Sequence, residues 1–263
     1  MSSSPAVPPS KSTSKPTSPT PPELFPPDEE ASLLAESHAL KSLGNQAFTT
    51  SAYYSAIQQY EKALATCPAY LDYDMAVLHA NISACHMKLS EWAPAVERAT
   101  RALDALDRLE APTTAPDASD AQAKETTETE MEMRLAALQR SGHSLMDAHK
   151  LRTKALLRRA KSSHARGGWA HLQSALQDYQ ALARPPHELS SLDMRAVLAA
   201  LRTLPDELDE AKNREMSEMM GKLKQLGNGI LKPFGLSTDN FAFTKDERSG
   251  GYSMNFQQNQ GNK

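Results

Sequence analysis

The chain has 263 residues, a formal net charge of −3, 40% hydrophobic residues and only 6% aromatic residues. A net charge this close to zero gives no reason to expect a nucleic-acid partner, and no apolar run reaches the roughly 20 residues that a membrane span needs. The N-terminus lacks the apolar core of a secretory signal. We expect Cys67 and Cys85 to be reduced, buried thiols. Together these features predict a cytoplasmic protein without a membrane partner.

Residues 1–30 form the first segment of the predicted organisation. They hold nine of the seventeen prolines, interspersed with Ser, Thr and Lys. Proline fixes φ and has no N–H, so neither a helix nor a central strand can form there. The composition predicts a disordered Pro/Ser-rich tail.

Apolar residues recur at helical spacing from Ala31 onwards. The spacing predicts a helix that reaches Phe48 and a second helix over 53–66, which Pro68 ends. A second pair of helices is predicted over 74–89 and 92–109, with Ser90 as the N-cap of the latter. Two helical hairpins therefore follow one another.

Residues 111–130 interrupt this pattern, because Ala, Pro, Thr, Asp and Glu dominate them and Lys124 is their one cation. We expect a disordered acidic insertion. A long helix is then predicted over 131–165, weakened at Gly142, and a helix over 169–183 closes a third hairpin.

Three further segments complete the chain. A helix over 189–204, with Leu192, Val197, Leu198 and Leu201 as its apolar stripe, would cap the open end of the array, so the repeat domain is placed at 31–204. An amphipathic C-terminal helix follows over 205–230, and 231–263 is an aromatic tail. The alternating apolar residues on either side of 246–251 are compatible with a short hairpin, which would have to dock on the chain to be stable.

The first hairpin resembles the tetratricopeptide repeat (TPR) signature. The residues that match the signature lie in the two helices of this hairpin and directly after the second helix. They are Leu40, Leu43, Gly44, Ala56, Tyr60, Ala63 and Pro68. Small residues at Gly44 and Ala56 would let two helices cross closely, and Tyr60 would fill the next gap. The resemblance implies an all-α, right-handed superhelix of three TPR hairpins with capping and C-terminal helices.

Five polar residues form the candidate binding site. Lys154 and Arg158 are four residues apart, so they point in one direction from a helix, as do Lys41 and Asn45. With Asn81 they predict one site, spread over three helices, for a ligand with carboxylates. The five positions resemble the carboxylate clamp of TPR domains that bind the acidic C-terminal tail of the chaperones Hsp70 and Hsp90. The alternative interpretation is a set of solvated helix faces without this activity.

A second resemblance concerns the last fifty residues or so. Met216-Ser-Glu-Met-Met-Gly-Lys-Leu-Lys-Gln-Leu-Gly and the segment that continues to Phe256 are similar to the C-terminus of the tetratricopeptide repeat protein 1 family, a set of cytosolic adaptors and suspected co-chaperones. We expect the tail to contact a client protein. The competing interpretation is that Phe234 and Leu236 fold back and dock on the helix over 206–226.

Enzymatic interpretations are weaker. His79 and His86 share a helix face, but a metal site would need closer ligands and further partners, so neither a metal site nor a cofactor is expected. The basic cluster at Arg158, Arg159 and Lys161 lacks the interleaved aromatic residues of a nucleic-acid patch. The sequence thus predicts a non-catalytic, monomeric co-chaperone adaptor for Hsp90 or Hsp70. The alternative is a TPR scaffold for a signalling or other client protein that acts independently of chaperones.

Overall fold

The computed structural model describes residues 25–109, 132–234, 237–238, 241–245 and 252–256. The predicted disorder at 1–24 and the acidic insertion at 111–130 lie outside these ranges. The regular elements, in chain order, are α1 (Pro27–Thr49), α2 (Tyr53–Thr66), α3 (Asp72–Lys88), α4 (Trp92–Asp107), an unlabelled helix over 132–140, α6 (Leu145–Arg166), α7 (Trp169–Leu182), α8 (Ser191–Leu231), η1 (Lys232–Phe234), β1 (Phe241–Lys245) and β2 (Tyr252–Phe256).

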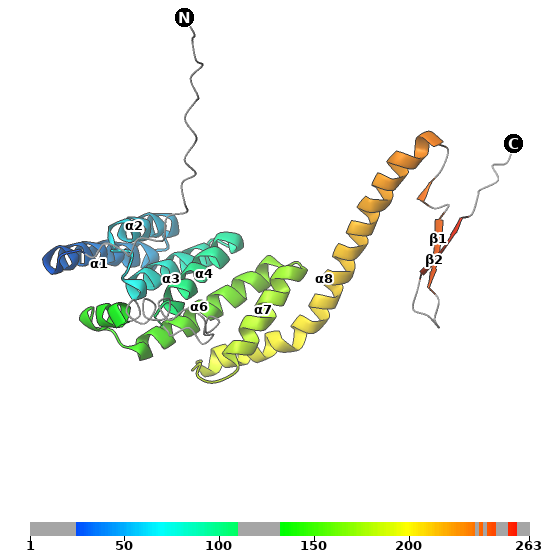
Figure 1. Cartoon of the computed structure of the whole chain (residues 1–263). Helices are drawn as coiled ribbons and strands as arrows, with labels where there is room; N and C mark the ends of the chain where they lie inside the picture. The colour runs from blue at the N-terminus through cyan, green and yellow to red at the C-terminus, as the bar shows by residue number, and fades with distance from the viewer. Residues whose placement is uncertain (1–24, 110–131, 235–236, 239–240, 246–251, 257–263) are drawn as a thin grey trace, which may run out of the picture.

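Three antiparallel helix pairs, α1/α2, α3/α4 and α6/α7, stack side by side, and α8 covers the last one (Figure 1). This confirms the predicted all-α array of three TPR-like hairpins with a capping helix. Ala56, expected at a helix crossing, is fully buried, and so are alanines in all three hairpins: Ala63, Ala95, Ala99, Ala102 and Ala175. A Cβ atom at Gly44 would lie 2.5 Å from Cε1 of Tyr60, so α1 and α2 can approach this closely only with glycine at that position.

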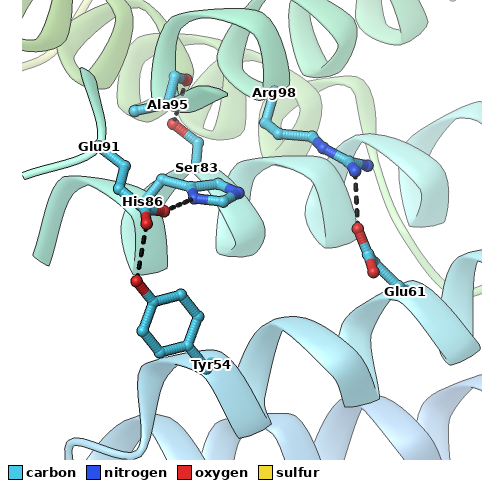
Figure 2. A network of polar contacts seen from close by, with 7 residues as sticks. All are labelled: Tyr54, Glu61, Ser83, His86, Glu91, Ala95 and Arg98. Atoms are coloured by element: carbon cyan, nitrogen blue, oxygen red, sulfur yellow. Dashed lines mark hydrogen bonds and ion pairs between the residues drawn. The ribbon is translucent and has the colours of Figure 1, made fainter. Parts of the chain in front are cut away.

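Polar contacts link neighbouring hairpins on the side of α2 and α4 (Figure 2). The Tyr54 hydroxyl donates to Glu91 at 2.8 Å, and Glu91 also pairs with His86 at 2.7 Å. Farther along the same helices, Arg98 pairs with Glu61 at 2.8 Å. These side chains therefore hold the first two hairpins in register.

Two helix starts differ from the sequence-based expectation. α1 begins at Pro27, inside the segment predicted to be disordered, because proline is favoured at the first helical position and Asp28, Glu29 and Glu30 complement the dipole of the first turn. The prediction that Ser90 is an N-cap is wrong. Ser90 has a φ of 58° in the turn, and Glu91 occupies the N-cap position of α4.

The single long helix predicted over 131–165 is interrupted. The chain turns after residue 140, where Gly142 adopts a φ of 78°, and α6 begins at Leu145. A capping box explains the new start: the Ser144 hydroxyl accepts from the Asp147 N–H at 3.2 Å, and the Asp147 carboxylate accepts from the Ser144 N–H at 3.1 Å. The helix over 132–140 packs back on the array, because Ala137 joins the core of the first hairpin and Leu138 joins the core of the later helices.

The predicted capping and C-terminal helices are one helix, α8, which continues through Pro205. Its buried residues are Val197, Leu204, Leu208 and Ala211, whereas Leu192 and Leu198 are 72% and 44% exposed, so half of the predicted capping stripe is wrong. The stripe that packs on α7 lies farther along the helix than expected. Ala211 is the last buried residue of α8, and the C-terminal part of the helix projects away from the repeats (Figure 1).

The far end of α8 carries a small β-hairpin. β1 and β2 pair antiparallel, with Phe241 opposite Phe256 and Lys245 opposite Tyr252, as the alternating sequence allowed. Asn228 Oδ1 accepts hydrogen bonds from the backbone N–H of Thr238 at 2.6 Å and from its hydroxyl at 2.8 Å. This contact fastens the chain after η1 to the end of α8.

Candidate functional site

The five predicted site residues lie on the first helix of each hairpin. α1 carries Lys41 and Asn45, α3 carries Asn81, and α6 carries Lys154 and Arg158. α6 packs against both α4 and α3, which brings the Arg158 side chain to the backbone beside Asn81. There Arg158 Nη1 donates to the carbonyl oxygen of Ala80 at 2.5 Å.

Arg158 is a half-buried cation. Burial lowers the pKa of its guanidinium, and the nearby Cys85 thiol and Tyr60 hydroxyl act in the opposite direction. Within the described part of the chain, no carboxylate lies within ion-pair distance of it. A desolvated cation without an anionic partner is costly, and a bound carboxylate would offset that cost.

Several other arginines of the array are paired with a carboxylate. Arg159, the next residue, forms two hydrogen bonds with Asp178 at 2.7 and 2.8 Å, and these bonds raise the pKa of its guanidinium. Arg98, Arg101, Arg108, Arg140 and Arg152 also contact a carboxylate. Arg158 is thus distinguished by its surroundings and not by its residue type.

Tyr60 connects α2 to the site and was expected only to fill a packing gap. Its hydroxyl donates to Asn45 Oδ1 at 2.7 Å, so the amide group of Asn45 is held in place and keeps both N–H donors for a ligand. Burial raises the pKa of Tyr60 to about 12, which keeps the hydroxyl protonated as the donor. The repeat pattern identified this tyrosine, but its hydrogen bond could be found only from the structure.

The remaining three site residues have no polar partner among the described residues. Lys41 and Asn81 are half-buried and Lys154 is exposed, and their side chains make no hydrogen bond or ion pair with the described residues. Lys154 lies one turn before Arg158 on α6, and Lys41 lies one turn before Asn45 on α1. All three side chains can therefore donate to a ligand without breaking an internal contact.

One more cation lies in line with Lys154 and Arg158 on α6 and was not predicted from the sequence. Lys150 is exposed one turn before Lys154 on α6. It lines a pocket of about 590 Å³ together with Met146, His149, Pro185 and Pro186. The four-residue spacing of Lys150, Lys154 and Arg158 was the signal that could have found it.

The alternative chemistries receive no support from the described residues. No group of three His, Cys, Asp or Glu side chains among them could hold a metal ion. Burial raises the pKa of Cys67 to about 12 and that of Cys85 to about 11, so neither thiol is activated as a nucleophile. In the suggested basic patch, Arg159 and Lys161 are paired with Asp178 and Asp193. None of the helices in this part of the chain has the length and apolarity that a bilayer span requires.

Comparisons with known proteins give partial likenesses. No protein-family model matches the chain. The mitochondrial import receptor subunits TOM70 of Mus musculus and Rattus norvegicus are each 31% identical to it over 75 residues, which is 28% of this chain and 12% of the receptor. Among solved structures, the Hsp90 co-chaperone Cns1 from Saccharomyces cerevisiae (delta69) is 16% identical, with a TM-score of 0.43 over 80% of this chain and 51% of its own. The chain thus spans about half the length of that structure and a much smaller part of the receptors.

Proposed function

We propose that this protein is a non-catalytic cytoplasmic adaptor whose α1–α3–α6 face binds the acidic C-terminal peptide of Hsp90 or Hsp70. The observation that carries the proposal is Arg158, a partly desolvated cation without a carboxylate partner in the described chain. Lys41 and Lys154 add two cations that have no partner in the described part of the chain, and Asn45 and Asn81 add amide donors. This combination suits a ligand that presents several carboxylates close together.

A peptide that ends in aspartate meets this requirement, because its α-carboxylate and side-chain carboxylate lie on the same residue. The cations supply attraction through charge-assisted hydrogen bonds. The amide of Asn45, held by Tyr60, supplies direction, because its N–H donors point from a fixed position. Such a site discriminates a free C-terminus from an internal acidic segment.

Isothermal titration with an acidic chaperone-tail peptide tests the proposal. Replacing Arg158 by Ala is expected to weaken binding by about 2–5 kcal/mol, because a bound carboxylate would lose its cation in a poorly solvated place. Replacing the exposed Lys154 by Ala should also weaken binding, but by less, because water screens that charge. The same peptide with an amidated C-terminus should bind the wild-type protein much more weakly. A matched control replaces Lys62 and Arg101, which lie on the second helices of their hairpins, by Ala and should leave the affinity unchanged.

The chaperone-independent scaffold is separated from this proposal by the same titration. If the protein is such a scaffold, it should bind neither the free nor the amidated peptide. Alternatively, the peptide should bind the Lys154→Ala/Arg158→Ala double variant as tightly as it binds the wild-type protein. Either result would overturn the clamp. Contact of the 231–263 tail with a client stays a prediction, and deletion of the tail should leave the peptide affinity unchanged if the two activities are separate.

A further inference from the structure

The projecting half of α8 carries a row of apolar side chains that nothing in the described chain covers. Met216, Met219, Leu223, Leu226 and Ile230 follow one another at spacings of three and four residues, which is the a/d pattern of a coiled-coil seam. These side chains, together with the adjacent Met220, are 47–64% exposed. A helix that shows this pattern usually packs against a second helix of the same kind.

The charges along α8 indicate that the second helix is α8 of another copy of this chain. Residues 206–218 contain six acidic and two basic side chains, whereas residues 219–232 contain three lysines and no acidic side chain. Two copies aligned in parallel would bring like charges together. Two copies aligned antiparallel would bring the acidic half of each helix beside the basic half of the other.

A pocket that could accept an apolar side chain lies where the projecting part of α8 begins. Trp169, at the start of α7, is 44% exposed and lies beside α8, where its backbone N–H donates to Glu215 at 2.7 Å. Trp169, Met216 and Met219 contribute the apolar part of a pocket of about 580 Å³, which Lys212, Glu215, Glu218 and Lys222 also line. An aromatic side chain in such a position is a typical anchor point of a protein interface.

We propose that two copies of this chain associate through antiparallel packing of their α8 helices. Met216 of each copy then lies opposite Leu226 of the other, and Met219 lies opposite Leu223. Ile230 of each copy reaches the Trp169 pocket of the other, so both ends of the row are covered. The inference goes beyond the peptide site and replaces the monomer that the sequence alone suggested.

Sedimentation velocity of the full chain over a wide concentration range tests the association. The wild-type protein should shift from monomer to dimer as its concentration rises. Leu223→Glu should raise the dimer dissociation constant by at least about tenfold, because a charge would be placed in the apolar centre of the contact. Ser217→Glu adds the same charge outside the row and should leave the constant unchanged. Circular dichroism should show the same helix content for all three proteins, since both positions are exposed.

Disulfide trapping tests the orientation. Met216→Cys and Leu226→Cys should form a mixed disulfide-linked dimer when the two single variants are combined, whereas each variant alone should crosslink weakly. The native Cys67 and Cys85 are buried and should not interfere. A wild-type protein that stays monomeric at every concentration would overturn the proposal and assign the row to a different protein. Dimers that Leu223→Glu does not weaken, or crosslinks of each variant only with itself, would also contradict it.

Discussion

Two adjacent arginines of α6 face different regions of the molecule. Arg159 points to the contact with α7, where Asp178 accepts two hydrogen bonds from it. Arg158 points to α3, where it donates to a backbone carbonyl and meets no carboxylate among the described residues. The arginine at the α6–α7 contact is thus paired, whereas the one on the α3–α6 face meets no carboxylate of the described chain. This difference distinguishes a structural cation from one that is available to a ligand.

The largest expected effect on stability comes from removing Asp178, the carboxylate partner of Arg159. Asp178→Ala should lower the free energy of unfolding by about 3 kcal/mol, because it leaves a partly buried guanidinium without its carboxylate. Arg158→Ala should lower it by only about 1 kcal/mol, since one hydrogen bond to the Ala80 carbonyl is lost and no ion pair among the described residues. Urea denaturation of both variants measures the contrast. Equal losses of stability would mean that the two arginines are equally structural.

His79 sharpens the comparison, because its surroundings disfavour a positive charge on the imidazole ring. Burial and then Arg98, Arg101 and Arg108 lower its pKa from 6.5 to about 4. The unfolded chain therefore takes up a proton below about pH 6.5 while the folded chain does not. The contribution of His79 to the free energy of unfolding should therefore fall by up to about 3 kcal/mol as the pH decreases from 6.5 to 4.

The measurement for His79 is the difference between the wild-type protein and His79→Gln in denaturant melts at pH 7 and pH 4.5. Other titrating groups are common to both proteins, so their contribution cancels in the difference. The variant should lose less stability than the wild-type protein on acidification. Parallel losses would show that His79 is protonated in the folded state.

Asn81→Asp should supply Arg158 with the carboxylate that it lacks. Asn81 follows the residue whose carbonyl Arg158 contacts, so an aspartate there would compete with the carboxylates of the peptide. We expect about a tenfold loss of peptide affinity, or roughly 1.4 kcal/mol, without loss of thermal stability. Titration of the variant with the chaperone-tail peptide measures this effect, and the matched Asn81→Ala variant separates the added charge from the lost amide. Unchanged affinity in Asn81→Asp would show that the peptide does not use Arg158.

The smallest effect is expected from the hydrogen bond that holds Asn45. Tyr60→Phe removes the hydroxyl donor but keeps the ring that packs against Gly44. Peptide binding should weaken by about 1 kcal/mol, because Asn45 is then free to turn away from the ligand. Binding is read by titration and folding by the melting temperature, which should stay within a few degrees. A large drop in melting temperature would instead assign the hydroxyl to the core.

The sequence by itself determined the helical array. Small residues at the positions of Ala56, Ala95 and Ala175, and apolar residues at helical spacing, leave little alternative to packed hairpins, because each helix must bury one face against the next. The sequence also places the five polar side chains on the first helices. In the pairs Lys41/Asn45 and Lys154/Arg158, the spacing of four residues fixes a common direction on the helix. These features depend on local periodicity, and they could be predicted for that reason.

Tertiary contacts decided the remainder. Only the positions of α7 and α3 determine that Arg159 contacts a carboxylate, whereas Arg158 contacts a backbone carbonyl and no carboxylate of the described residues. The partner of Arg159 lies nineteen residues away, and that of Arg158 lies on another hairpin. The break at Gly142 depends on whether the preceding helix can pack back on the first hairpin, which Ala137 does. The continuation of α8 through Pro205 depends on Leu204 and Leu208, whose burial on either side of the proline holds both parts of the helix against the array. Local propensity does not contain these long-range contacts, so the sequence could propose the site, and only the fold shows which of its cations contact a carboxylate of the described residues.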